Sequence, residues 1–292
     1  MGTALPVIIN PAAGPERPVL HALNRGFGRD ADWRLLITRG PGDAARFARE
    51  LTAQGARKIA VCGGDGTVKE VAAALAGTPV ALAILPGGTG NALATELRIP
   101  LDLAQAARLA VELAPRKRTI DLGRIGDHVF VLRASLGLET LVLTNTPRDL
   151  KNELGGLAYP LTALNQLGQL PPTRYTLTID GVPIEANGVQ CTLANSAQMG
   201  VSGLSLAQGV SVDDGLLDVI VVTTADLAAL ADIAASNFLG QDLGSDILHW
   251  QGREIRVDAD PAQDIALGGD IVARTPATIT VWPRALTVIV PD

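Results

Sequence analysis

Apolar positions in the first 115 residues recur in two alternating patterns. Short apolar runs of strand length occur at Leu5–Ile9, Trp33–Thr38, Lys58–Cys62 and Val80–Leu85. Other segments carry their apolar residues at helical spacing, which predicts helices over Asp43–Gln54, Thr67–Ala76, Asn91–Leu97 and Leu103–Leu113. Strands that alternate with helices predict a parallel sheet covered on both faces. Such sheets bind ligands beyond the carboxyl ends of their strands.

The pattern changes after Pro115, where most of the predicted elements are strands. These strands are Thr119–Leu122, His128–Ala134, Arg174–Ile179, Glu185–Ala194, Leu217–Val222, Glu254–Val257, Thr278–Val281 and Leu286–Val290. Two predicted helices, Pro147–Leu167 and Ala225–Phe238, interrupt the series. We therefore predict an α/β protein of two domains. Residues 1–118 form a doubly wound α/β domain, and residues 119–292 form an antiparallel β-sandwich with helical insertions.

Composition and charge narrow the class of protein. Apolar residues make up 47% of the 292 positions and charged residues 18%, which favours an ordered chain. The formal net charge is −6, and the one basic run, Arg116–Arg118, follows Pro115 and reads as a solvated turn. We therefore expect no nucleic-acid partner and no adhesion to anionic membranes over a broad surface.

The cysteines, the N-terminal residues and the lengths of the apolar runs lead us to expect a cytoplasmic protein. Cys62 and Cys191 lie in apolar runs without metal-ligand spacing, as buried thiols of a reducing compartment do. The N-terminus carries no pattern of a signal peptide, and no apolar run approaches the roughly 20 residues of a membrane span. We expect any membrane contact to be peripheral.

The first candidate site is Gly63-Gly64-Asp65-Gly66-Thr67, which joins a predicted strand to a predicted helix. Glycine permits a sharp turn and close approach of a ligand. A helix N-terminus offers free N–H groups and a positive dipole end, which suit a phosphate. Asp65 repels phosphate unless a cation lies between them, so it indicates Mg²⁺. The same residues are also compatible with a turn that binds nothing.

Two further loops strengthen the prediction of a phosphate site. Leu85–Ala94 repeats the strand, glycine-rich turn and helix, with Thr89 and Asn91 able to supply side-chain hydrogen bonds. Asn10–Gly14 follows the first strand at the same edge of the sheet. Three such loops at one edge predict a single polyphosphate site.

In order and spacing, these motifs resemble those of the diacylglycerol kinase catalytic-domain family, which includes sphingosine, ceramide and bacterial lipid kinases. The residues that carry the resemblance are Val7–Pro11 with Gly14, Gly63–Thr67 with Glu70, and Leu85–Asn91. Later motifs extend it over nearly the whole chain: Leu154–Gly155, Leu157–Tyr159, Asn195, Gly200 and Asp213–Asp218.

The resemblance implies a kinase that transfers the γ-phosphoryl group of ATP to a hydroxyl of a lipid such as diacylglycerol. Its active site is expected in a cleft between a nucleotide-binding domain and an acceptor domain, at the periphery of a membrane. The nucleotide-binding residues that it implies are Asn10, Pro11, Gly14, Thr38, Gly63, Gly64, Asp65, Gly66, Thr67, Val68, Lys69 and Thr89. A homodimer is left open.

The resemblance also implies a structural Mg²⁺. The expected ligands are the Asp214 carboxylate and the backbone carbonyls of Ser211 and Leu216. Taken without the resemblance, Asp213-Asp214-Gly215 before a strand is also simply a good turn.

Two positions depart from the family pattern. Lys69 stands where the family usually has Asn, and it can reach a phosphate as a point charge or face solvent. Gly268 stands where the family usually has the aspartate proposed as general base. The base is then Asp270, with Asp264 less favoured, or Asp65, as the equivalent aspartate is thought to be in sphingosine kinases. The remaining alternative is a protein that binds nucleotide and lipid but catalyses phosphoryl transfer only weakly.

Two other functions stay open at this point. An NAD kinase also uses a Gly-Gly-Asp-Gly loop, but its Asn-Glu motif lies at a strand end, whereas Asn152-Glu153 falls in a polar helical stretch. A non-catalytic sensor of nucleotide or lipid is the second alternative, and it is motivated by Gly268.

Overall fold

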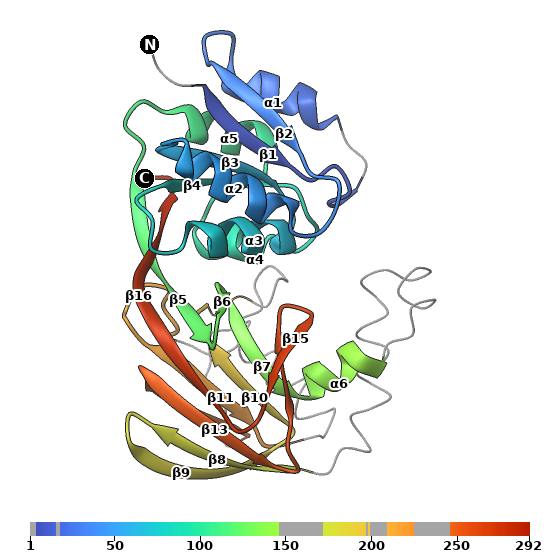
Figure 1. Cartoon of the computed structure of the whole chain (residues 1–292), viewed down its shortest axis with the longest axis vertical. Helices are drawn as coiled ribbons and strands as arrows, with labels where there is room; N and C mark the ends of the chain where they lie inside the picture. The colour runs from blue at the N-terminus through green and yellow to red at the C-terminus, as the bar shows by residue number, and fades with distance from the viewer. Residues whose placement is uncertain (1–3, 16–17, 146–171, 197, 199–208, 225–245) are drawn as a thin grey trace.

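The computed structural model describes residues 4–15, 18–145, 172–196, 198, 209–224 and 246–292. Over these residues the chain forms two domains stacked along its longest axis (Figure 1). The predicted helices Pro147–Leu167 and Ala225–Phe238 lie outside the described residues. Within the described part, no helix is long and apolar enough to cross a membrane.

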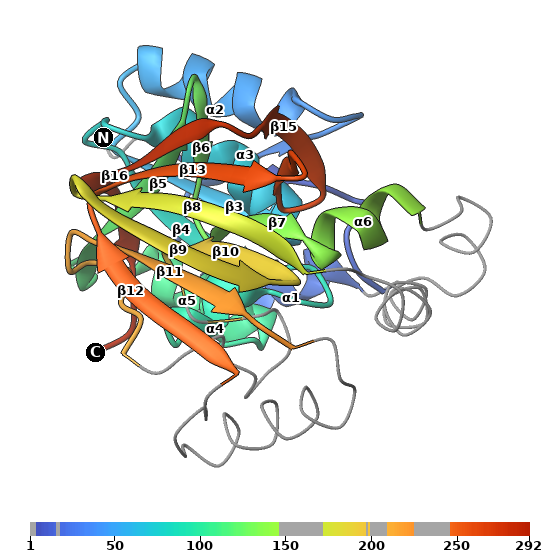
Figure 2. The same cartoon turned by 90° about the horizontal axis from the view of Figure 1, so that it is seen from below.

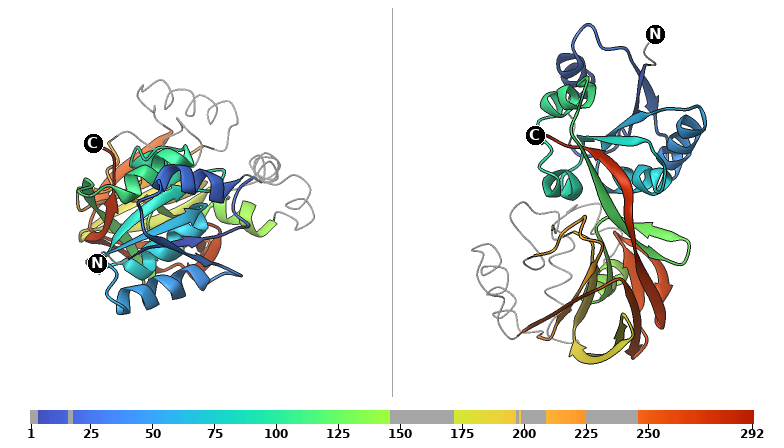
Figure 3. Two further views of the ribbon diagram at one scale, coloured as in Figure 1. Left: turned by 90° about the horizontal axis from the view of Figure 1, so that it is seen from above. Right: turned by 90° about the vertical axis from the view of Figure 1, so that its left-hand side faces the viewer.

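The first domain is a parallel sheet between two layers of helices. Its strands are β1 (Leu5–Ile9), β2 (Trp33–Ile37), β3 (Lys58–Gly63) and β4 (Ala81–Pro86), in the order β2-β1-β3-β4. Its helices are α1 (Val19–Phe27), α2 (Asp43–Ala53), α3 (Asp65–Leu75), α4 (Ala92–Glu96) and α5 (Leu103–Val111). Helices α1, α4 and α5 cover one face, and α2 and α3 cover the other (Figure 3). Strands β1 and β4 are buried at every residue, as expected of a sheet covered on both sides.

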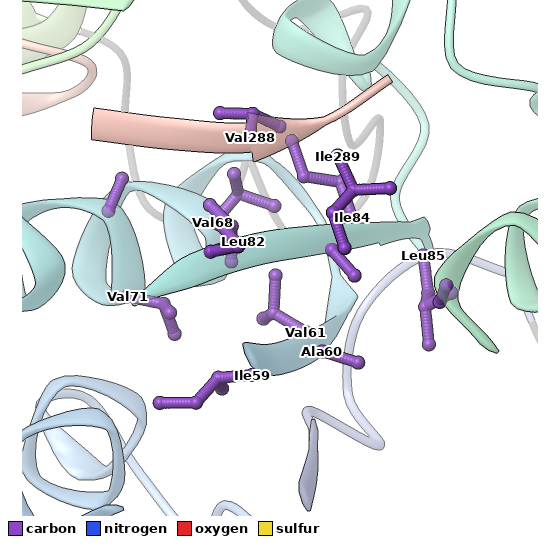
Figure 4. Packing of buried hydrophobic residues seen from close by; sticks show 14 of the residues in the cluster. Ile59, Ala60, Val61, Val68, Val71, Leu82, Ile84, Leu85, Val288 and Ile289 are labelled. Atoms are coloured by element: carbon purple, nitrogen blue, oxygen red, sulfur yellow. The ribbon is translucent and has the colours of Figure 1, made fainter. Parts of the chain in front are cut away.

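Two strands run through the junction between the domains: β5 (Lys117–Ile125) and β16 (Ala277–Ile289). They pair antiparallel with each other, with a bulge between Trp282 and Leu286. The end of β16 pairs parallel with β4, and Val288 and Ile289 lie in the core of the first domain (Figure 4). The boundary between residues 118 and 119 stays a prediction, and the C-terminal end of the chain packs within the first domain.

The second domain is a β-sandwich. Its further elements are β6 (His128–Phe130), β7 (Arg133–Gly137), α6 (Leu138–Asn145), β8 (Thr173–Ile179), β9 (Val182–Gly188), β10 (Gln190–Ala194), β11 (Leu217–Val222), β12 (Ile247–Gly252), β13 (Glu254–Asp260), β14 (Asp264–Leu267) and β15 (Asp270–Arg274). One sheet has the antiparallel order β12-β11-β10-β7-β14-β15. The facing strands are β16, β13, β8 and β9, with β5 and β6 paired beside β16, and they continue through β4 into the sheet of the first domain (Figure 2). Alternate residues such as Leu136, Leu193 and Ile255 fill the space between the sheets.

The two-domain α/β prediction is confirmed, and several strand predictions are wrong in detail. His128–Ala134 is two strands, because β6 pairs with β5 whereas β7 belongs to the facing sheet. Glu185–Ala194 is likewise split, because β9 and β10 lie in opposite sheets. Thr278–Val281 and Leu286–Val290 are one strand, β16, whose bulge carries Pro283 and Arg284. Helices α1 and α6 and strands β12, β14 and β15 were not predicted.

Leu286→Ala tests the contribution of β16 to the first core. Leu286 is fully buried there, so we expect the substitution to lower the free energy of unfolding by about 2–5 kcal/mol. The matched control is Leu113→Ala, because Leu113 is fully exposed and its truncation leaves no cavity. Urea denaturation of both variants measures the difference. Equal stabilities would show that the end of β16 does not support the fold.

Candidate functional site

Three loops meet at the carboxyl ends of β1, β3 and β4. The N–H of Gly87 donates to the carbonyl oxygen of Gly63 at 2.8 Å, which joins the β4–α4 loop to the β3–α3 loop. The N–H of Asn10 donates to the carbonyl oxygen of Cys62 at 2.9 Å, which joins the β1 loop to the same group. The three loops singled out in the sequence are therefore neighbours in space.

Glycine is required because the backbones of these loops touch. A Cβ atom on Gly87 would lie 2.8 Å from the Gly63 Cα, and one on Gly88 would lie 2.6 Å from the Gly64 Cα. A Cβ atom on Gly14, whose φ is +71°, would lie 2.2 Å from the carbonyl oxygen of Gly87. No other residue type fits these contacts without displacing the backbone.

Short polar side chains fix the shape of the loops. Asn91 has a left-handed backbone with φ of 52°. Its Oδ1 accepts from the N–H of Gly88 at 3.0 Å, and its Nδ2 donates to the Gly88 carbonyl oxygen at 2.8 Å. Asn10 Nδ2 donates to Thr67 Oγ1 at 3.0 Å. These contacts between protein groups help to hold the loops in shape.

Asp65 connects two of the loops. It is the first residue of α3, and its Oδ1 accepts from the N–H of Ala92, the first residue of α4, at 2.7 Å. The helix starts two residues earlier than the sequence predicted, because Asp65 and Gly66 belong to its first turn. The first N–H groups of α3 have no carbonyl ahead of them within the helix, so this end is suited to an anion.

The other predicted nucleotide residues are distributed around this centre. Thr38 is buried and donates its N–H to the carbonyl oxygen of Ile9 at 2.9 Å. Val68 is buried in the core of the first domain, whereas Pro11 and Thr89 are exposed on their loops. Glu70 accepts from the N–H groups of Gly42 and Ala45, at 3.0 and 3.4 Å, and so fixes the start of α2 next to α3.

Lys69, on α3, joins the first domain to the second. Its Nζ donates to Asp270 Oδ2 at 2.7 Å and to the carbonyl oxygen of Leu267 at 3.1 Å. Gly268 and Gly269, with φ of +57° and +108°, form the turn between β14 and β15. Of the two candidate bases on this hairpin, Asp270 therefore lies at the end next to α3. Asp264 lies at the opposite end of β14, near Arg274 at 3.8 Å.

The predicted metal ligands lie in the loop before β11. Asp214 Oδ1 accepts from the N–H of Leu216 at 3.0 Å, and Ser211 Oγ donates to Asp213 Oδ1 at 2.9 Å. A bidentate pair with Arg118 holds the pKa of Asp213 below its usual range. The pKa of Asp214 is raised, chiefly by burial and also by the charges of Asp218 and Asp121.

The donor set near Asp214 is suited to a magnesium ion. Asp218 is fully buried, and its Oδ2 has no hydrogen-bond partner among the described residues. The described side chains include no group of three or more His, Cys, Asp or Glu that could hold a metal. Mg²⁺ is commonly held by only one or two carboxylates together with water, so a set of Asp214 and two backbone carbonyls fits it.

Asp121 is a residue that the sequence interpretation missed. It is buried at the domain junction, where Oδ1 accepts from the N–H of Arg284 at 2.6 Å and Oδ2 from the N–H of Gly215 at 2.7 Å. It thereby ties the bulge of β16 to the Asp214 loop. A carboxylate between Ile120 and Leu122 in a predicted strand was the available signal, because buried charges need partners.

Gly87→Ala tests the contact between the loops. We expect overpacking against Gly63 to lower the free energy of unfolding by about 1–3 kcal/mol. Gly66→Ala is the control, because a Cβ atom at Gly66 meets nothing within 4 Å. Thermal and urea denaturation measure both variants. If Gly87→Ala is as stable as Gly66→Ala, the loops do not touch as described.

Comparisons with known proteins agree with this architecture. Residues 4–125 match the diacylglycerol kinase catalytic domain, and residues 133–290 match the YegS C-terminal NAD kinase beta sandwich-like domain. A protein of Pseudomonas fluorescens named "Probable lipid kinase YegS-like" is 34% identical over 272 residues, which cover 90% of this chain and 88% of that one.

A second relative and a solved structure extend the comparison. A protein of the same name from Pseudomonas putida is 36% identical over 244 residues, covering 80% of this chain and 81% of its own length. A crystal structure described as a candidate diacylglycerol kinase from Bacillus anthracis superimposes with a TM-score of 0.79 at 26% identity, covering 99% of this chain and 97% of that one. The chain therefore belongs to the family of lipid kinases that is defined by the diacylglycerol kinase catalytic domain.

Proposed function

We propose that this protein transfers the γ-phosphoryl group of ATP to a hydroxyl of a lipid such as diacylglycerol, with Mg²⁺ required. The observation that carries the proposal is the convergence of three glycine-rich loops at the N-terminus of α3, next to a hairpin of the second domain. Free N–H groups and the positive end of the helix favour the phosphates of a nucleotide. The hairpin supplies the side of the site from which an acceptor hydroxyl approaches.

The proposed reaction depends mainly on positioning and charge. Phosphoryl transfer passes through a loose transition state that oriented donors and cations stabilise. The α3 N-terminus holds the phosphates, and the Lys69 ammonium adds a positive charge at the side of the acceptor. Asp270 or Asp65 accepts the proton of the acceptor hydroxyl. Bound Mg²⁺ would stabilise the loop of Asp214, where it is held with the carbonyls of Ser211 and Leu216.

Transfer of label from γ-labelled ATP into a total lipid extract tests the proposal. Wild type is expected to produce a labelled lipid, whose mobility identifies the acceptor. Saturable nucleotide binding without any labelled lipid would favour a sensor, and conversion of NAD to NADP would favour an NAD kinase. In the sensor case, Gly268→Asp should raise activity.

Asp65→Asn should lower kcat by about 10²–10⁴-fold, because Asp65 supplies a base or the charge that attracts a cation. Asn keeps an Oδ1 that can accept from the N–H of Ala92, so the loops should stay joined. Asp102→Asn is the matched control, because Asp102 also accepts a backbone N–H at a helix start, that of Gln105 at 2.9 Å. Label transfer by both variants gives the comparison. Equal activity of Asp65→Asn and wild type would remove Asp65 from the chemistry.

Asp214→Asn should abolish stabilisation by Mg²⁺. Because the folded protein raises the pKa of Asp214, its ionised form costs stability above that pKa, and a bound cation relieves the cost. At neutral pH without divalent cations, the variant should therefore be at least as stable as wild type. Millimolar Mg²⁺ should then raise the Tm of wild type only. A thermal-shift titration at constant ionic strength measures this, and an equal response of the variant would place the ion elsewhere.

A further inference from the structure

Lys69 is the side chain that bridges the phosphate loops and the acceptor-side hairpin. It lies four residues after Asp65, so the two side chains share one face of α3, one turn apart. Its Nζ contacts two groups of the second domain, Asp270 Oδ2 at 2.7 Å and the carbonyl oxygen of Leu267 at 3.1 Å. The ammonium therefore occupies the boundary between the proposed phosphate site and the acceptor side.

The surroundings of Lys69 allow its head to move. Its side chain is 29% exposed, and that of Asp270 is 74% exposed. Residue 268, beside the lysine stem, is glycine, and a Cβ atom there would meet only the Lys69 Cδ, at 3.9 Å. A lysine ammonium is a compact charge with three donors on a flexible stem, so it can change partners without movement of the backbone.

The Lys69 ammonium has two candidate partners, the Asp270 carboxylate and a nucleotide phosphate, and it interacts with them with different strengths. An ion pair with a well-exposed carboxylate contributes little to binding. The terminal phosphate of a nucleotide carries more negative charge and would sit at the start of the same helix. The phosphate is therefore the stronger competitor for Lys69.

The geometry points to an exchange of partners by Lys69 when ATP binds, and this inference rests on the proposed function. Without nucleotide the ammonium holds Asp270, and with ATP it binds the terminal phosphate and releases the Asp270 carboxylate. While the ammonium holds Asp270 Oδ2 at 2.7 Å, that oxygen is engaged, and release leaves it free to contact the acceptor hydroxyl. ADP lacks the terminal phosphate and leaves the pair intact.

The chemical step then balances with the groups named. The acceptor oxygen forms a bond to the γ-phosphorus, and the bond from that phosphorus to the bridging oxygen of ADP breaks. The hydroxyl proton passes to the Asp270 carboxylate. Lys69 acts through Asp270 as a positioning residue. It releases the Asp270 carboxylate to act as a base only when a transferable phosphate is bound.

Binding of ATP and of ADP, measured by calorimetry, tests the exchange without turnover. Asp270→Asn removes the competitor, so ATP should bind up to about fivefold more tightly, the factor that corresponds to an exposed ion pair. Lys69→Gln should weaken ATP binding by about tenfold, as loss of a charge-assisted contact does. ADP affinity should stay unchanged in both variants. The double variant should match Lys69→Gln, because Asp270 acts through Lys69.

The control is Glu185→Gln. It removes the carboxylate of another exposed ion pair, in which Glu185 Oε1 lies 2.8 Å from Arg174 Nη2. It should change neither affinity. If Asp270→Asn leaves ATP affinity unchanged, or changes ADP affinity equally, the exchange does not occur. If wild type binds no nucleotide at all, the proposed function fails instead.

Steady-state kinetics give a second, independent readout. Lys69→Gln should raise the KM for ATP, whereas Asp270→Asn should mainly lower kcat. Lys69→Arg should restore the affinity for ATP, because a cation at this position suffices to contact the phosphate. A parallel fall of kcat in all three variants, with KM unchanged, would indicate a purely structural role for the pair and would overturn the inference.

Discussion

The contact between the backbones of Gly63 and Gly87 determines the arrangement of the candidate site. It brings the loops after β3 and β4 to within hydrogen-bonding distance and leaves no room for a side chain. The Gly14 loop packs on the same point. This close approach places the start of α3 beside the loops after β1 and β4. The phosphate-binding proposal, the position of Asp65 and the reach of Lys69 all depend on that placement.

The second domain is attached through continuous strands and a buried carboxylate. Strands β5 and β16 pass through the junction, and the end of β16 completes the sheet of the first domain. Asp121 ties the β16 bulge to the loop of Asp214 by two hydrogen bonds. Ser196 Oγ adds a contact across the junction, to Glu96 Oε2 at 2.6 Å. The loop of Asp214 is therefore held at the junction through Asp121, and the hairpin between β14 and β15 is held next to α3 through Lys69.

Local patterns in the sequence predicted many of the strands and the glycine-rich loops. Strands β1 and β11 begin and end as predicted, because short and mostly apolar runs define them. The three loops were found because glycine-rich turns after parallel strands must meet at one edge of the sheet. The changes of sheet between β6 and β7 and between β9 and β10 were not predicted. Apolar residues run without a break through the first, from Val129 to Leu132, and the shift in alternation between Ala186 and Val189 was not interpreted as a break.

Contacts between distant residues were beyond such patterns. The Lys69–Asp270 pair joins residues 201 positions apart, and no local sequence pattern predicts that these two side chains meet. The two links made by Asp121 join residues 94 and 163 positions away. The sequence singled out the glycine-rich loops as a candidate site, but the contact of the second domain with α3 had to come from the structure.

Hydrogen exchange of backbone amides, with and without ATP and Mg²⁺, tests most directly whether the three loops form one phosphate site. The account predicts slower exchange at residues 64–69 and 87–91, with little change on helices α1 and α5. Protection confined to another part of the surface, or none in these loops under conditions where ATP is bound, would contradict it.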